Sequence, residues 1–132
     1  MELAVLAVFK TNSGYHSKGI CSHITVPKGS IAPLVTNSYI IYTPDKGVDY
    51  LIPRPDGSII VGGASHRFGP FKEQWFNNTD DGNLIEAAKD YYDGYMQRTF
   101  RGWENTDAKV EQIWTGGRFS FSCLGINTES RQ

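Results

Sequence analysis

The stretch DYLIPRPDGSIIVGG, residues 49–63, decides the fold because it places two apolar runs on either side of a turn sequence. Pro55, Asp56 and Gly57 separate the runs, and an Asp-Gly pair readily supplies the positive φ angles of a tight hairpin turn. The stretch therefore predicts a β-hairpin held by Gly57. The pair Gly62-Gly63 at its end indicates either a bulge or strand end, or a close approach of backbone or ligand.

Three further segments show strand patterns around this hairpin. Residues 20–26, ICSHITV, alternate with period two and stop at a Pro-Lys-Gly turn sequence. Residues 38–43, SYIIYT, are aromatic and β-branched and also run into turn-forming residues. Residues 109–115, KVEQIWT, complete the set, so we expect strands on both sides of the hairpin in the chain.

One segment shows helical spacing. Within residues 83–100, apolar and aromatic side chains recur near the helical period, which predicts a long helix packed on the sheet. Leu84, Ala88 and Tyr95 should then be more buried than the charged residues Glu86, Lys89 and Asp90. The fold class expected is α+β, with an antiparallel-rich sheet and one long helix.

The composition fits one folded domain and excludes several classes of protein. The chain has 132 residues, of which 39% are hydrophobic, and a formal net charge of -1, so no basic surface favours nucleic acid or an anionic membrane. The apolar run in residues 1–10 lacks the charge and cleavage site of an export signal, and it is far shorter than the ~20 residues of a membrane-spanning helix. We expect a soluble, cytoplasmic chain.

Motifs of catalysis and metal binding are absent from the sequence. It contains no GxSxG, Walker, HExxH or strand-linked GxGxxG pattern, and its three histidines, His16, His23 and His66, lack the spacing of metal ligands. Cys21 and Cys123 belong to no CxxC pair, which gives little support to a disulfide framework or a zinc site. Catalytic residues therefore stay unidentified, and we expect no metal site.

An ordered set of segments nevertheless resembles one group of enzymes. The chain is similar to fungal FAD-dependent oxidoreductases of the D-amino-acid oxidase superfamily, and the resemblance covers residues 18–116. Residues 1–17 and 117–132 diverge from the family pattern. The segments that carry the resemblance are KGICS at 18–22, YLIPRPDGSIIVGGA at 50–64, WFNNTDD at 75–81, DGYMQRTFRGWE at 93–104 and IWTG at 113–116.

The resemblance implies the middle of a flavoenzyme, the antiparallel sheet on the substrate side, without its Rossmann-like FAD domain. It implies oxidation of the C–N bond of a small amino acid or amine, with FAD as the cofactor of the full-length family. It also implies Tyr50 and Arg54 as substrate contacts, although packing of Tyr50 and solvation of Arg54 explain these residues equally well. Because no phosphate-binding motif is present, we expect this fragment to retain no FAD and to be inactive alone. The alternative is a non-catalytic binding module derived from the same domain.

Overall fold

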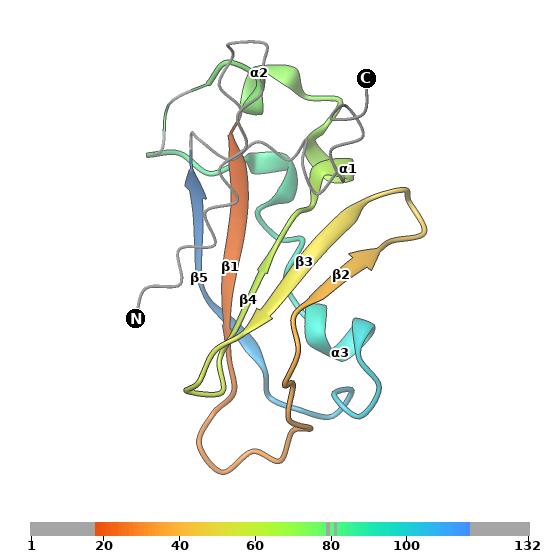
Figure 1. Cartoon of the computed structure of the whole chain (residues 1–132). Coiled ribbons are helices and arrows are strands. Elements are labelled where there is room, and N and C mark those ends of the chain that lie inside the picture. Colours follow the sequence, from red (N-terminus) through yellow and green to blue (C-terminus); the bar gives the residue numbers. More distant parts are fainter. Residues whose placement is uncertain (1–17, 79, 81, 117–132) are drawn as a thin grey trace, which may run out of the picture.

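The computed structural model describes residues 18–78, 80 and 82–116. Its fold is α+β, and every segment expected to be a strand contains one (Figure 1). The five antiparallel strands lie in the order β2-β3-β4-β1-β5. Their bounds are Gly19–Thr25 for β1, Tyr39–Tyr42 for β2, Val48–Pro53 for β3, Ile59–Gly62 for β4 and Lys109–Gly116 for β5.

The predicted hairpin is confirmed as β3 and β4. Its strands pair antiparallel from Tyr50 opposite Gly62 to Pro53 opposite Ile59. Gly57 has a φ of 85°, a conformation that side chains with a Cβ rarely adopt. The turn is closed by a 2.8 Å hydrogen bond from the backbone amide of Arg54 to the carbonyl of Ser58. The hairpin turn therefore depends on the glycine that the sequence marks.

The predicted long helix is wrong. Residues 83–100 form only the 3-10 turn η1, Glu86–Ala88, and the short helix α3, Tyr95–Thr99. The other helices, α1 at Ser65–Phe68 and α2 at Lys72–Trp75, have four residues each, and no helix in the described part of the chain could span a membrane. The physical reason is local: Ile85 is extended, and Gly94 adopts a left-handed conformation with φ of 65°, which interrupts helical hydrogen bonding.

The order of burial expected for that segment is confirmed. Ala88 and Tyr95 are buried, and the charged residues Glu86, Lys89 and Asp90 are exposed, as expected. Leu84 is 39% exposed, whereas its neighbour Ile85 is fully buried. Leu84 is still less exposed than the side chains of Glu86, Lys89 and Asp90, as predicted. Ile85 takes the core position, because a chain that turns instead of continuing as a helix directs the next residue into the core.

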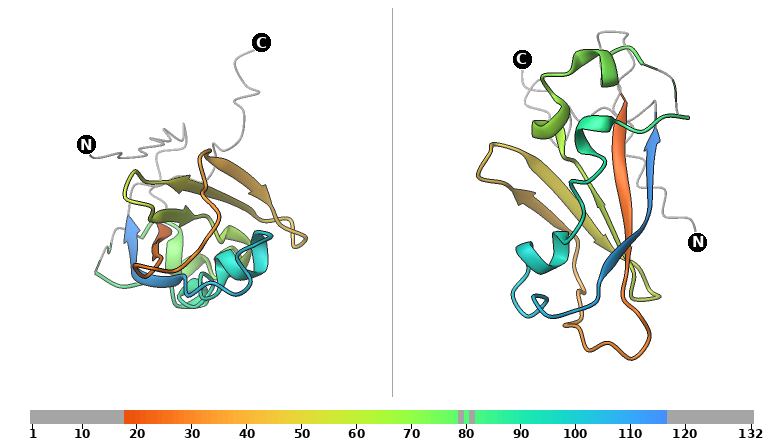
Figure 2. Two further views of the ribbon diagram at one scale, coloured as in Figure 1. Left: turned by 90° about the horizontal axis from the view of Figure 1, so that it is seen from below. Right: turned by 180° about the vertical axis from the view of Figure 1, so that it is seen from behind.

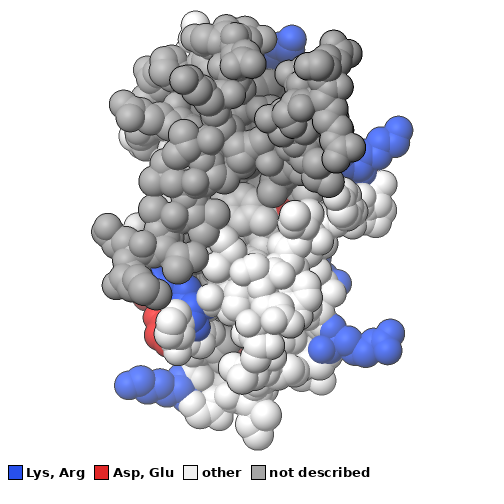
Figure 3. Space-filling view, in the orientation of Figure 1, with Lys and Arg blue, Asp and Glu red and all other residues white. Residues whose placement is uncertain are grey.

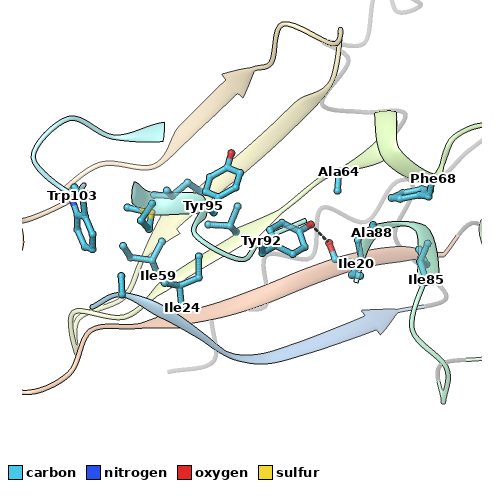
Figure 4. Packing of buried hydrophobic residues seen from close by; sticks show 14 residues of the cluster. Ile20, Ile24, Ile59, Ala64, Phe68, Ile85, Ala88, Tyr92, Tyr95 and Trp103 are labelled. Carbon is cyan, nitrogen blue, oxygen red and sulfur yellow. Dashed lines mark hydrogen bonds between the residues drawn. The ribbon is translucent and has the colours of Figure 1, made fainter. Parts of the chain in front are cut away.

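The core lies between one face of the sheet and the segment that runs from η1 to α3. Two views of the ribbon show this segment on one side of the strands (Figure 2). Residues of β1, β3 and β4 pack against Tyr92, Tyr95 and Met96 in a continuous apolar cluster (Figure 4). The hydroxyl group of Tyr92 donates a 3.0 Å hydrogen bond to the carbonyl of Ile20, so this buried ring is also anchored by its polar end. The helical layer therefore covers one face of the sheet.

Candidate functional site

Tyr50 lies on the opposite face of the sheet from this core. Its ring lies over Gly62 of the neighbouring strand, where an added Cβ would stand 2.2 Å from the ring. The hydroxyl group of Tyr50 is 2.8 Å from the thiol of Cys21 on β1. The missing side chain at Gly62 therefore makes room for a packed tyrosine ring. Gly62 is also the last residue of β4, so of the two alternatives for the glycine pair the strand end is observed here.

Burial keeps the Tyr50 and Cys21 pair uncharged. Loss of hydration raises the pKa of the Cys21 thiol to about 11, although the hydrogen bond with Tyr50 acts in the other direction. Burial also raises the pKa of Tyr50 well above its ordinary value, and the neighbouring thiol adds to this effect. Both groups are protonated at neutral pH, so they form a polar contact without a nucleophile.

The same face of the sheet carries exposed apolar side chains. On β2, Ile40 is 53% exposed and Tyr42 is 77% exposed, while Ile52, Ile60 and Trp114 on the adjoining strands are half-buried. The space-filling view shows that the described surface on this side is largely free of charged residues (Figure 3). A surface with few charged side chains and exposed apolar ones is suited to contact with another apolar surface.

Asp49 occupies the core side of β3, next to Tyr50 in the sequence. It is fully buried, and its Oδ2 atom accepts hydrogen bonds from the hydroxyl groups of Tyr91 at 2.6 Å and Tyr95 at 2.9 Å. Its Oδ1 atom accepts a 2.8 Å bond from the backbone amide of Ala64. Sequence reasoning missed this cluster, although an acidic residue at a core position of a strand is a signal that it needs buried donors.

Arg98 completes the cluster from the outside. Its guanidinium lies 5.2 Å from the ring centre of Tyr91 and 4.9 Å from that of Tyr95, and it donates hydrogen bonds to the backbone carbonyls of Tyr91 and Asp93. Burial raises the pKa of both tyrosines, and the neighbouring Asp49 raises it further. The tyrosine hydroxyls therefore remain donors, and the cluster stabilises the fold without presenting a reactive group.

The Gly62-Gly63 turn does not fit the diphosphate of a dinucleotide. A glycine-rich turn binds phosphate through free backbone amides at the start of a helix. Here the amide of Ala64 already donates to Asp49, and a Cβ on Gly63 would lie 2.5 Å from the Oδ1 atom of Asp49. The following helix, α1, has only four residues. The Asp49 carboxyl group therefore fills the space that a phosphate would need.

Arg54 lies away from the Tyr50 and Cys21 pair. It follows the end of β3, four residues beyond Tyr50, which is about 13 Å at the usual rise of a strand. Arg54 lines a cleft of about 480 Å³ whose described lining does not include Tyr50. The two predicted substrate contacts therefore face different surroundings, and the structure does not bring them into one small site.

The histidines within the described residues form no metal centre. His23 lies 3.7 Å from Glu111, and His66 packs edge-on against Tyr91. Each has one buried ring nitrogen without a hydrogen-bond partner among the described residues. In this part of the chain, no group of three or more histidine, cysteine or acidic residues could hold a metal ion, and His16 lies outside it.

Comparison with known proteins identified no relative of this chain. No family model, no curated protein and no solved structure matches it.

Proposed function

We propose that this chain supplies the substrate-side sheet of an FAD-dependent oxidoreductase of the D-amino-acid oxidase superfamily, acting on the C–N bond of an amino acid or amine. The proposal rests on the ordered sequence segments described above. The observation that supports it best is the two-sided character of the sheet. Helical segments cover one face, whereas the described part of the other face shows few charged side chains and carries Tyr50 and exposed apolar residues on β2.

The roles of the described residues follow from their surroundings. Tyr50 would contact the substrate through the edge of its ring and through its hydroxyl group, which also contacts the thiol of Cys21. Arg54 would contact the same substrate only if the substrate extended along β3 toward the hairpin turn. Because the Gly62-Gly63 turn does not fit a dinucleotide, the redox cofactor would have to be held elsewhere.

The second candidate function is a non-catalytic binding module built on the same sheet. The contact between Asp49 and the amide of Ala64 favours it, because the Gly62-Gly63 turn that leads into α1 is closed to phosphate. The two candidates share the sheet surface and differ in whether a flavin-binding partner belongs to it.

Sequencing the transcript on both sides of the present chain distinguishes the candidates. The oxidoreductase proposal expects an in-frame GxGxxG that follows a strand pattern and opens a helix. Continuous reading frames without such a motif would overturn this proposal and leave the binding module.

A flavin assay on the purified chain tests whether the cofactor is held elsewhere. After incubation with FAD and desalting, its absorbance spectrum should show no flavin band. A stoichiometric band would mean that the chain holds the cofactor itself, contrary to the contacts of Asp49.

A further inference from the structure

The cleft beside Arg54 has the size and composition of a ligand site. It lies between the loop of residues 26–35 and the turn of the β3–β4 hairpin, at the end of the sheet opposite α1 and α2 (Figure 1). Its volume of about 480 Å³ falls within the range of roughly 300–1,000 Å³ that small-molecule pockets occupy.

The most buried residues that line the cleft are apolar, and they form its floor. Trp103 is 3% exposed and Ile59 is 2% exposed, and the half-buried residues Val26 and Val35 stand beside them. This floor would receive an aliphatic or aromatic group and remove it from water, which is the main source of affinity in such pockets.

The backbone that forms the walls of the cleft is conformationally restrained in the absence of a ligand. Four prolines line the cleft, Pro53 at the end of β3 and those at positions 27, 33 and 55 in loops, and each fixes one backbone angle. Pro33 also packs on Gly102, where an added Cβ would lie 2.9 Å from the proline ring. A restrained wall loses less conformational entropy on binding, which favours ligands of modest size.

The rim carries an excess of positive charge. The charged residues that line the cleft are Lys28, Arg54 and Asp56, and all three are exposed. The Oδ1 atom of Asp56 accepts hydrogen bonds from the amide and the hydroxyl group of Ser58, at 2.9 Å and 2.5 Å. Arg54 makes no ion pair with any carboxylate of the described residues. Asp56 is engaged mainly by Ser58 in the turn, and the charge of Arg54 makes a smaller contribution to the lowered pKa of that carboxyl group. The Arg54 guanidinium, without a direct ion pair, is open to a planar anionic group.

We propose that this cleft binds a small carboxylate with an apolar body, with Arg54 pairing the carboxylate and Trp103 and Ile59 contacting the apolar part. The site is independent of the proposed oxidation, because it needs neither a flavin nor Tyr50. It therefore holds for an oxidoreductase fragment and for a binding module alike.

Titration of the purified chain with phenylacetate, followed by NMR, tests this site. Saturable shifts are expected at the Trp103 indole and at the amides of Ile59 and Ser58. Phenylacetamide, which has the same ring and no charge, should bind at least about tenfold more weakly, equivalent to about 1.4 kcal/mol. Equal binding of the two compounds, or no saturable shift with phenylacetate, would overturn the proposal.

Substitutions identify the residue that recognises the anion. Arg54→Gln should weaken phenylacetate binding by about tenfold and leave the affinity for phenylacetamide unchanged, whereas Arg54→Lys should retain part of the preference for the anion. Arg101→Gln is the matched control, because Arg101 is exposed and does not line the cleft. An Arg54→Gln variant that melts normally and binds phenylacetate like the Arg101→Gln variant would assign the shifts to a non-specific contact and reject the site.

Discussion

The hydroxyl group of Tyr95 donates a 2.9 Å hydrogen bond to the carboxyl group of Asp49, a residue 46 positions earlier in the chain. Tyr91 donates to the same oxygen, so one buried side chain of β3 joins the hairpin to the segment that carries α3. A buried polar group is costly unless it is paired, and here donors and acceptor satisfy one another. This cluster fixes the side of the sheet on which the helical layer lies.

Removal of the acceptor should destabilise the protein more than removal of one donor. Asp49→Ala leaves the hydroxyl groups of Tyr91 and Tyr95 and the amide of Ala64 without their partner, so we expect a loss of about 3 kcal/mol in the free energy of unfolding. Tyr95→Phe should cost about 1 kcal/mol. Urea denaturation measures both, with Tyr42→Phe on the exposed β2 strand as a neutral control. In the double variant, the two losses in free energy of unfolding should sum to less than the separate losses, because both changes break the same contact. Strictly additive losses would contradict the shared contact.

The hairpin turn gives a second prediction. Gly57→Val should lower the free energy of unfolding by about 1 kcal/mol or more, because Gly57 has a φ of 85°. Space is not the cause, since an added Cβ at Gly57 would meet no atom within 4 Å. Gly57→Asn is the matched control, because asparagine tolerates the left-handed conformation better. Equal melting temperatures for the valine variant and the natural protein would refute the turn assignment.

At Gly62 the expected cost comes from space instead. Gly62→Ala would place a Cβ 2.2 Å from the Tyr50 ring, which should cost about 1–3 kcal/mol through overpacking. In a background of Tyr50→Ala the same change should be much less costly, because the ring is gone. Thermal melts of the two single variants and the double variant measure this coupling. An unchanged cost in the double variant would mean that Tyr50 is not the neighbour responsible.

Adjacent residues in the segment before η1 provide a matched pair. Ile85→Ala should cost about 2–5 kcal/mol, because Ile85 is fully buried. Leu84→Ala should cost much less, since Leu84 is 39% exposed and leaves no enclosed cavity. Chemical denaturation of the two variants compares similar deletions one residue apart. The reverse order would restore the helical stripe that the sequence pattern predicts.

The buried thiol predicts a dependence of stability on alkaline pH. The pKa of Cys21 is raised from 9.0 to about 11, so above about pH 9 the unfolded chain loses this proton while the folded chain keeps it. The free energy of unfolding should therefore fall between about pH 9 and pH 11, by up to about 1.4 kcal/mol per pH unit from this group.

Denaturation curves measured across that range in a Cys123→Ser background test this effect. The decline should be smaller when Cys21→Ala is added, because the alanine variant has no thiol to ionise at this position. Identical pH slopes with and without the Cys21 thiol would show that its pKa is not raised by folding.

The sequence by itself determined the strands and the hairpin, because their signals are local. Alternation of apolar residues and a turn with Asp-Gly act over a few neighbouring positions, so β1 to β5 appear where the pattern predicts them. The helical pattern at residues 83–100 is equally local, but the chain does not follow it. Only the tertiary structure decided that the chain turns at Gly94 and that Tyr91 and Tyr95 converge on Asp49.

The same distinction applies to the candidate sites. The even spacing of Tyr50 and Arg54 in the sequence predicts that both side chains lie on the same face of a strand. The pairing of β1, β3 and β4 decided that Tyr50 lies over Gly62 and contacts Cys21. The packing of Pro33 on Gly102 brought a loop and Trp103 beside Arg54 to enclose a cleft. Contacts between residues that are distant in the sequence depend on the summed packing of the whole domain, and no local pattern encodes that sum.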